Sequence, residues 1–204
     1  MIIRRWSCAI KGLKFTAVVW LVLLSLLLAG CGDLRFRPQN LVKSDIDLVA
    51  DLHYRETQNL LRELTVKLYK RNPGQLRRGP GYSVEQRLDQ LFSQVGYVPY
   101  KELSFARGTD ALELALSPDY RGDRVMAVMA GLNGMIRHAY GYKDEFFMFD
   151  ELDQQKLYDS ARNVEILVWR LARSGGKKEP LLLTNSLPGE PANLSFERLF
   201  GKLI

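Results

Sequence analysis

The sequence predicts a mainly α-helical bundle of about five helices, with at most a minor extended element. Three observations lead to this fold class. Apolar residues recur at helical spacing along several long segments, and polar capping residues stand where these segments begin. One further segment, residues 125–136, is apolar on nearly every face, which is typical of a buried helix. We expect one domain over residues 44–204, long enough to bury a core.

The first predicted helix covers residues 44–71. Ser44 is a suitable N-cap with Asp47 three positions later, and Asn72-Pro73-Gly74 would end the helix. Six residues recur on one stripe that we expect to face the core: Ile46, Val49, His53, Leu60, Leu64 and Leu68.

A second helix is predicted from Ser83 through Gln94. Ser83 and Gln86 have the spacing of a capping box, in which each side chain bonds the other residue's backbone N–H. The segment that follows, residues 96–108, reads as irregular and aromatic. Its aromatic residues are Tyr97, Tyr100 and Phe105.

A short helix over residues 111–116 is expected next, capped by Thr109 or Asp110. The central helix is predicted over residues 121–140, interrupted by the polar Asn133. Small residues stand one turn apart on this helix, which lets a neighbouring backbone approach closely: Ala127 with Gly131, and Ala130 with Gly134.

The last part of the chain predicts two more helices. Asp150 can cap a helix over residues 151–173, which Ser174-Gly175-Gly176 would end. Residues 181–184 are expected to form a short strand or a buried extended segment, and Ser195 can cap a final helix. The inner stripe of the long helix is expected to be Leu157, Ala161, Val164, Val168 and Leu171.

Residues 1–30 have the organisation of an export signal. Their basic residues form a positive start without any acid, and residues 15–28 are almost entirely apolar. A retained membrane anchor is the alternative, but the apolar run is shorter than the roughly 20 residues that a membrane-spanning helix needs. We therefore expect residues 1–30 to be removed. The four basic residues are Arg4, Arg5, Lys11 and Lys14.

The tetrapeptide Leu28-Ala29-Gly30-Cys31 at the end of this run resembles the lipobox of bacterial lipoproteins at every position. The resemblance implies a lipid on the Cys31 sulfur, cleavage before Cys31, and acylation of the new amino group. Two or more acyl chains would hold the protein stably on a lipid bilayer. Because Asp33 does not directly follow the cysteine, the resemblance favours the outer membrane over the inner membrane.

Composition limits the remaining classes of function. Four of the six net positive charges of the chain leave with residues 1–30, so the mature chain is close to neutral and predicts no binding to nucleic acid. Cys8 would be removed and Cys31 lipidated, which leaves no thiol for a disulfide or a metal. We predict neither a metal site nor a cofactor. Residues 31–43 are expected to be a lipidated tether whose flexible part spans about 20 Å.

The histidines and one acidic cluster are the candidates for chemistry. His53 is interpreted as a hydrogen-bonded residue of the partly buried stripe, and His138 lies near the end of the central helix, where a positive ring suits the helix dipole. The acidic cluster could bind Ca²⁺ or provide paired carboxylates, but acids are also favoured where a helix begins. Its members are Asp144, Glu145, Asp150, Glu151 and Asp153.

A basic cluster follows the first helix, with no acid between Glu63 and Glu85. It is either a solvated helix end or a contact for anionic headgroups or another acidic polymer of the envelope. The cluster consists of Lys67, Lys70, Arg71, Arg77 and Arg78. The aromatic run at residues 146–149 is expected to be core, and if exposed it would form a patch for a partner.

These observations predict a membrane-anchored envelope lipoprotein that acts as a non-catalytic helical adaptor or accessory subunit, with another envelope protein as its partner. The alternative is a lipoprotein that binds a ligand or polymer through the basic loop 67–78 or an aromatic pocket. An enzyme that uses His138 with the acidic cluster is the third hypothesis, and it requires these side chains to meet in one cleft.

Overall fold

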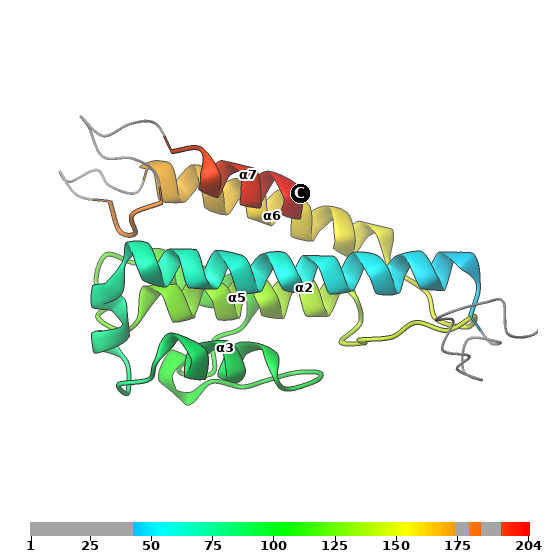
Figure 1. The fold of residues 1–204 in the computed structure, drawn as a ribbon, viewed down its shortest axis with the longest axis horizontal. Coiled ribbons are helices and arrows are strands. Elements are labelled where there is room, and N and C mark those ends of the chain that lie inside the picture. The colour runs from blue at the N-terminus through cyan, green and yellow to red at the C-terminus, as the bar shows by residue number, and fades with distance from the viewer. Residues whose placement is uncertain (1–42, 174–179, 185–192) are drawn as a thin grey trace, which may run out of the picture. The chain divides into compact units, whose positions relative to one another are not determined.

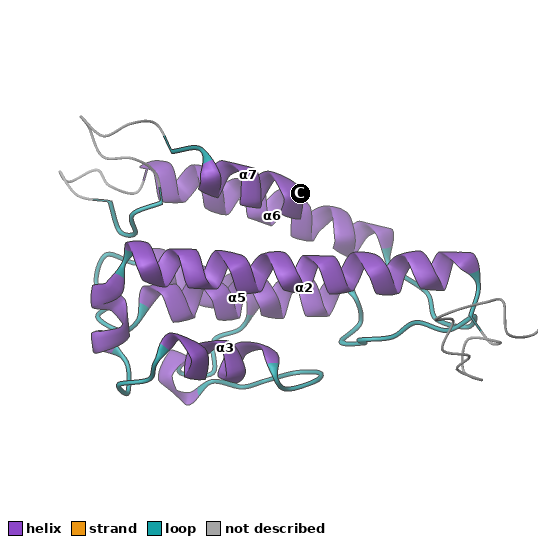
Figure 2. Cartoon of the chain, viewed as in Figure 1, coloured by secondary structure: helices purple, strands orange, loops and turns teal. Residues whose placement is uncertain are grey.

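A computed structural model describes residues 43–173, 180–184 and 193–204. Over these ranges the chain is mainly helical and contains no strand (Figure 2), which confirms the predicted fold class for the described residues. The lipobox and the predicted helix stop at residues 174–176 lie outside them. The elements are α2 (Asp45–Arg71), η2 (Pro73–Arg78), α3 (Val84–Phe92), η3 (Lys101–Leu103), α4 (Gly108–Leu116), α5 (Arg124–Ala139), α6 (Gln154–Arg173) and α7 (Ser195–Leu203).

Helix α5 is the centre of the bundle. It contacts α2, α3, α4 and α6, and nearly all of its residues are buried, as predicted for a helix that is apolar on every face. In Figure 1, α2 runs along α5, with α6 and α7 on one side of this pair and α3 on the other. None of the helices in the described ranges is long and apolar enough to cross a membrane.

Helices α2 and α5 are antiparallel. The ring of Tyr54, early in α2, packs 5.0 Å from the ring of Tyr140, just after α5. At the opposite end, the backbone N–H of Arg124 donates to Gln75, in the 3-10 turn η2 after α2, at 3.0 Å. The end of α5 therefore lies beside the start of α2, and the start of α5 lies beside η2.

The predicted capping boxes are present at two helices. Ser44 with Asp47 caps α2, and Ser83 with Gln86 caps α3, each through reciprocal side-chain and backbone hydrogen bonds. Helix α5 begins three residues later than predicted because the carboxylate of Asp123 accepts the N–H of Met126 at 3.0 Å.

Three predicted caps were wrong. Helix α4 begins at Gly108, without a side-chain cap at Arg107, so Thr109 and Asp110 lie inside the helix. Helix α6 begins at Gln154, because the Asp153 carboxylate rather than Asp150 accepts the first N–H groups, from Gln155 at 3.0 Å and Lys156 at 3.2 Å. In α7 the N–H of Ser195 donates to the Asn193 side chain, so Ser195 is itself capped.

The predicted core stripe of α2 was wrong in its first two turns. Ile46, Val49 and His53 are exposed, whereas Leu64 and Leu68 are buried as expected. The buried face at the start of α2 is instead formed by Asp47, Ala50, Asp51 and Tyr54. Tertiary hydrogen bonds to these polar residues determine the orientation, and helical periodicity alone cannot detect such bonds.

Residues 181–184 form no strand: the chain bends at residues 181 and 182, and Leu182 is buried. Asn72, directly after α2, holds this segment through two hydrogen bonds. The Leu183 N–H donates to Asn72 Oδ1 at 2.8 Å, and Asn72 Nδ2 donates to the Leu183 carbonyl at 3.0 Å. The Asn72 amide thus satisfies both the backbone N–H and the carbonyl of Leu183, as the backbone of a neighbouring strand would do.

Candidate functional site: a cavity between α4, α5 and α6

A cavity of about 280 Å³ lies among α4, α5, α6 and the irregular segment before α4. Its size approaches the lower limit of ordinary small-molecule sites. The irregular segment contributes Gly96, Tyr97, Val98, Tyr100, Ala106 and Arg107, and α4 contributes Gly108 and Thr109. The other lining residues are Ala130, Asn133, Gly134, Met135, Arg137, His138, Tyr142, Lys156, Asp159, Ser160 and Asn163.

The start of α4 forms one wall of the cavity because α5 offers it two glycines. A Cβ atom built on Gly131 would lie 2.8 Å from the carbonyl oxygen of Gly108, and one on Gly134 would lie 3.5 Å from the Gly108 nitrogen. The small residues of α5 thus allow the close backbone approach that the sequence predicts. Gly108 and Thr109, the first two residues of α4, thus line the cavity, and the helix begins without a side-chain cap at Arg107.

Arg137 is buried in the cavity wall, where its guanidinium interacts with the Tyr54 hydroxyl, which in turn donates to Asp144. Arg137 is 5% exposed, its NH1 donates to the Gly96 carbonyl at 2.9 Å, and its buried Nε has no partner. No carboxylate of the described residues pairs with it within ion-pair distance. Buried arginines are rare unless they are paired, because desolvation of the charge is costly.

The two other buried arginines show how this fold normally satisfies such a charge. Arg87 forms a bidentate pair with Glu102 and lies 3.2 Å from an oxygen of Asp123. The guanidinium of Arg124 donates to four carbonyl oxygens, those of Ala115, Ser117, Pro118 and Tyr120. Arg137 has neither arrangement.

Asn133 lies one turn before Arg137 on α5 and also lines the cavity. Its Nδ2 donates to the Leu91 carbonyl at 2.8 Å, which fixes the orientation of the amide. Its Oδ1 is buried without a partner. The wall therefore presents both a buried guanidinium without a directly paired carboxylate in the described chain and an unused hydrogen-bond acceptor.

Aromatic side chains form another part of the cavity. Tyr142 has a left-handed backbone (φ 60°), and its N–H donates to the Arg137 carbonyl at 2.7 Å. The Tyr142 ring lies edge-on to His138, at 5.7 Å, and to Tyr97, at 6.4 Å. The Arg107 guanidinium lies 4.9 Å from the centre of the Tyr97 ring. A strained turn thus places flat apolar surfaces beside cationic groups.

The ionisable lining is predominantly cationic. Arg107, Arg137 and Lys156 face a single carboxylate, that of Asp159. Burial raises the pKa of Tyr100 to about 12, so its hydroxyl stays protonated at neutral pH. The arrangement can hold an anion by charge and hydrogen bonds, beside an apolar or aromatic surface.

The structure brings only one of the two histidines to this cavity. His138 lines it and is exposed. His53 is also exposed, but its Nδ1 is hydrogen-bonded to the Tyr140 hydroxyl at 2.5 Å, and it does not line the cavity. His53 is therefore hydrogen-bonded, as the sequence analysis expects, although it is not part of the core stripe.

The predicted acidic cluster does not meet His138 among the residues that line the cavity. Asp144 accepts a hydrogen bond from the Tyr54 hydroxyl at 2.9 Å, Glu145 lies 3.8 Å from Lys43, and Asp150 pairs with Lys143. Asp153 caps α6, as described above. Within the described ranges, no group of three or more acids, histidines or cysteines could hold a metal ion.

The basic cluster lies at the opposite end of α5 from the cavity, because η2 is next to the start of α5. Lys67 helps to dock α7: its Nζ donates to the Ser195 carbonyl at 3.2 Å and lies 5.2 Å from the centre of the Phe196 ring. Lys70, Arg77 and Arg78 are exposed, and Arg71 is half-buried. The cluster is therefore divided between a packing role and an exposed basic surface.

Sequence reasoning did not single out Arg137 or Arg107 as site residues. A usable signal was present on the central helix, where Asn133 and Arg137 stand four residues apart within an otherwise apolar segment. Polar residues at that spacing share one helix face, and a polar face on a buried helix indicates either a hydrogen-bonded network or a site. No such signal marks Arg107, whose role depends on how residues 96–107 fold.

Comparison with known proteins adds no assignment to this geometry. No family model, no curated protein and no solved structure matches the chain.

Proposed function

We propose that this protein is a lipid-anchored envelope protein that binds a small anionic ligand, without catalysis, in the cavity between α4, α5 and α6. Arg137 is the observation that carries the proposal. The guanidinium is 5% exposed, its Nε has no partner, and no carboxylate pairs with it directly in the described chain, since Asp144 is reached only through the Tyr54 hydroxyl. An anionic ligand would supply that direct partner.

The wall defines the chemistry of the ligand. An anionic group, such as a carboxylate or a phosphate, fits Arg137 and the uncapped start of α4, since helix N-termini favour anions. The free Oδ1 of Asn133 calls for a hydroxyl or amide N–H on the ligand. A ring or apolar part fits beside Tyr97 and Tyr142.

The ligand is tested with protein extracted from membranes in mild detergent. We expect dialysis against the small-molecule extract of the same cells to leave an anionic compound on the wild-type protein, identified by mass spectrometry. Arg137→Gln is expected to lose it. Because Arg137 is buried, Arg107→Glu provides a second variant at an exposed lining position, and Arg77→Gln in the distant basic cluster is the matched control.

Either of two results would contradict the cavity proposal. One is that the wild-type protein retains no anionic compound. The other is that Arg137→Gln and Arg107→Glu retain it as fully as Arg77→Gln does, which would place binding elsewhere on the protein.

The anchor is the second half of the proposal and rests on the lipobox at residues 28–31. Lipidation of Cys31 would hold the protein on a bilayer, with the outer membrane favoured over the inner one. Metabolic labelling with a palmitate analogue is expected to mark the wild-type chain and not Cys31→Ser. Equal labelling of both chains would refute the anchor, whatever the outcome of the ligand experiment.

A helical adaptor is a second candidate, favoured by exposed apolar side chains on α6. Ile166 and Trp169 are 43% and 57% exposed, and side chains of this kind are typical of partner contacts. Crosslinking in membranes followed by purification is expected to recover one envelope protein in a fixed ratio. Loss of that protein in a double variant, Ile166→Ser with Trp169→Ser, would support the adaptor role, and unchanged recovery would contradict this surface.

A further inference from the structure

The start of α2 carries its apolar side chains on the outside. Ile46 is 77% exposed, and its exposed apolar neighbours on the first two turns are Leu48, Val49 and Leu52. A surface helix normally directs such residues to the core and polar residues to solvent. The first two turns of α2 do the reverse, since Asp47 and Asp51 are on the buried face.

This orientation is fixed by specific bonds. Asp51 Oδ1 accepts the N–H of Phe146 at 2.7 Å, and its other oxygen pairs with Lys43, whose side chain is almost fully buried. Asp47 closes the capping box with Ser44. Rotating α2 to bury Val49 would break these bonds, so the apolar face stays outward.

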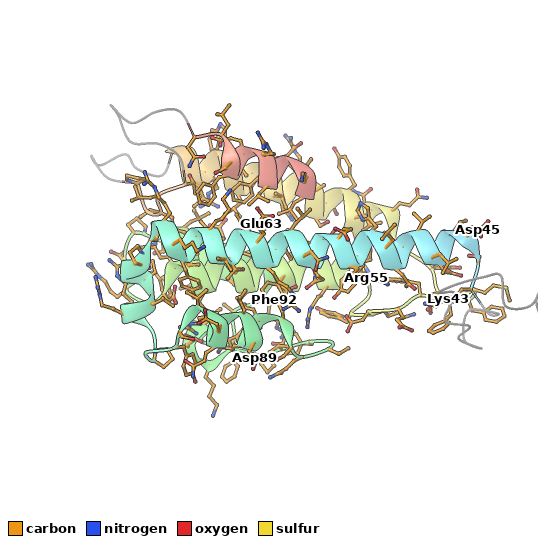
Figure 3. The ribbon with its side chains drawn as sticks, in the orientation of Figure 1. Lys43, Asp45, Arg55, Glu63, Asp89 and Phe92 are labelled. Carbon is orange, nitrogen blue, oxygen red and sulfur yellow. The ribbon has the colours of Figure 1, made fainter. Side chains whose placement is uncertain are left out.

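The loop after α5 lies beside the start of α2, where it is bonded to the buried face of that helix, and it carries further exposed apolar side chains. Tyr54 donates to Asp144, and the Lys43 Nζ lies 4.8 Å from the centre of the Phe147 ring, so residues 144–147 are fastened to the start of α2. Met148 and Phe149 follow directly, and Phe149 is 85% exposed. Figure 3 shows Lys43 at this end of α2, beside that loop.

We call these six side chains the α2-start patch. They are Ile46, Leu48, Val49, Leu52, Met148 and Phe149. Several large apolar residues gathered at one end of a domain exceed the scattered exposure that is normal on a protein surface.

The length of chain before α2 identifies what covers the patch. Eleven residues separate Cys31 from Lys43, and a flexible segment of that length spans roughly 20 Å on average. If Cys31 carries the lipid, as proposed above, the patch lies at the end of the domain to which this tether is joined. A lipid surface is then within reach of the patch at all times.

The charges around the patch select the kind of lipid. Asp45, Glu56 and Asp144 are exposed near it and Arg55 is an exposed cation on the next turn of α2, so acids are in excess, whereas Lys43 is already engaged by Asp51. Acidic groups at the edge disfavour an anionic bilayer, because like charges repel at the surface. Headgroups without net charge remain compatible with both the apolar centre and the acidic edge.

We propose that the α2-start patch inserts into the interface of a bilayer of zwitterionic lipids, and thereby orients the domain on the membrane that holds Cys31. This inference rests on the proposed lipid anchor. It goes beyond the anchor, because a lipidated chain without such a patch would leave the domain free to tumble at the end of its tether.

The cysteine content of the chain makes the test direct. Cys8 and Cys31 are its only cysteines, the first expected to be removed and the second to be lipidated, so a new cysteine is the one reactive thiol. Val49→Cys in the lipidated full chain is labelled with a fluorophore and reconstituted in phosphatidylcholine vesicles that contain brominated acyl chains. The control is Leu194→Cys, an apolar position 66% exposed at the start of α7.

The control lies far from the patch. Lys67 contacts Ser195, and Lys67 lies eighteen positions after Val49 on α2, or about 27 Å along the helix. We expect bromine quenching at position 49 to be roughly threefold stronger than at 194, since interfacial apolar faces lie about 5–10 Å into the headgroup boundary. Both labelled positions are exposed, so neither substitution threatens folding.

The outcomes separate the two proposals. Attachment to vesicles with equal, weak quenching at positions 49 and 194 overturns the patch and leaves the anchor intact. Failure of the wild-type chain to attach overturns the anchor, and the patch proposal with it. A label at position 49 that is shielded from water in native membranes but not quenched by lipid would show that a protein covers the patch, which also overturns the lipid proposal.

Discussion

Arg87 and Glu102 form a bidentate ion pair in which NH1 donates to Oε1 at 2.6 Å and NH2 donates to Oε2 at 2.9 Å. Arg87 is fully buried, and Asp123 and Tyr69 complete the network, with the Tyr69 hydroxyl donating to Asp123 at 2.8 Å. Burial raises the pKa of Asp123, and the positive charge of the neighbouring Arg87 acts in the opposite direction and lowers it. This network joins α2, α3 and α5, and it pairs a buried arginine directly with carboxylates, which no described residue does for Arg137.

Glu102→Gln is expected to lower the free energy of unfolding by about 2–3 kcal/mol, since the Arg87 charge would lose one of its two carboxylates in a buried site. The matched control is Glu113→Gln, which neutralises a pair of similar geometry on the surface, between Glu113 and Arg170. The Glu113 side chain is 63% exposed, so its loss is expected to cost less than about 1 kcal/mol. Urea denaturation measures both, and equal effects would contradict the role of burial.

Gly131→Ala is expected to destabilise the protein by about 1–3 kcal/mol, because the added Cβ would lie 2.7 Å from Leu112 Cδ2 and 2.8 Å from the Gly108 carbonyl. Gly134→Ala is the matched control: its nearest contact would be 3.5 Å. Alanine favours the helix by up to about 1 kcal/mol over glycine, so Gly134→Ala should be neutral or stabilising. Thermal unfolding of both variants checks this, and a reversed order would refute the close packing of α4 on α5.

The stability of the protein is expected to fall at alkaline pH because of its buried tyrosines. Burial raises the pKa of Tyr100 from 10.0 to about 12. The unfolded chain therefore loses this proton first, so the contribution of Tyr100 is fully present below pH 10 and is lost as pH rises towards 12. Each pKa unit corresponds to about 1.4 kcal/mol.

Tyr100→Phe should reduce the loss of stability that the wild-type protein shows as pH rises above 10. Tyr158→Phe, at a residue 65% exposed, should leave that pH dependence unchanged. The measurement is the melting temperature between pH 8 and pH 11.5, followed by circular dichroism. An identical pH dependence in wild type and Tyr100→Phe would show that this hydroxyl ionises as readily in the folded protein as in the unfolded chain.

Asn72→Ala is expected to release residues 181–184 from the end of α2, because the Asn72 amide makes both hydrogen bonds to Leu183. Hydrogen exchange at the Leu183 amide should become at least about tenfold faster, in keeping with loss of roughly 1–2 kcal/mol of local stability. Asn59→Ala, at an exposed position within α2, is the control. Unchanged exchange at Leu183 would mean that packing of Leu182 alone holds the segment.

Local sequence patterns predicted the helices well. The capping boxes at Ser44 and Ser83 and the buried character of α5 follow from residues within a few positions of one another. The patterns failed where a residue far away in the sequence determines which face of a helix is buried. Asp51 turns the start of α2 inward only because the Phe146 N–H and Lys43 meet it there.

The candidate cavity shows the same division. The sequence placed an aromatic segment, two helix glycines and Asn133 in the chain, but it did not show that they would surround one space. That depends on Gly131 admitting the start of α4 and on the turn at Tyr142 directing its ring back towards α5.

The sequence by itself determined that the described chain is helical and where α2 and α3 begin, because periodicity and capping depend on residues close together in the chain. The tertiary structure alone decided which buried arginine of the described chain has no directly paired carboxylate and which apolar face of α2 points outward. Arg87, Arg124 and Arg137 are alike as residues. They differ only in the oxygen atoms that distant segments bring to them, and residue type and spacing do not encode that difference.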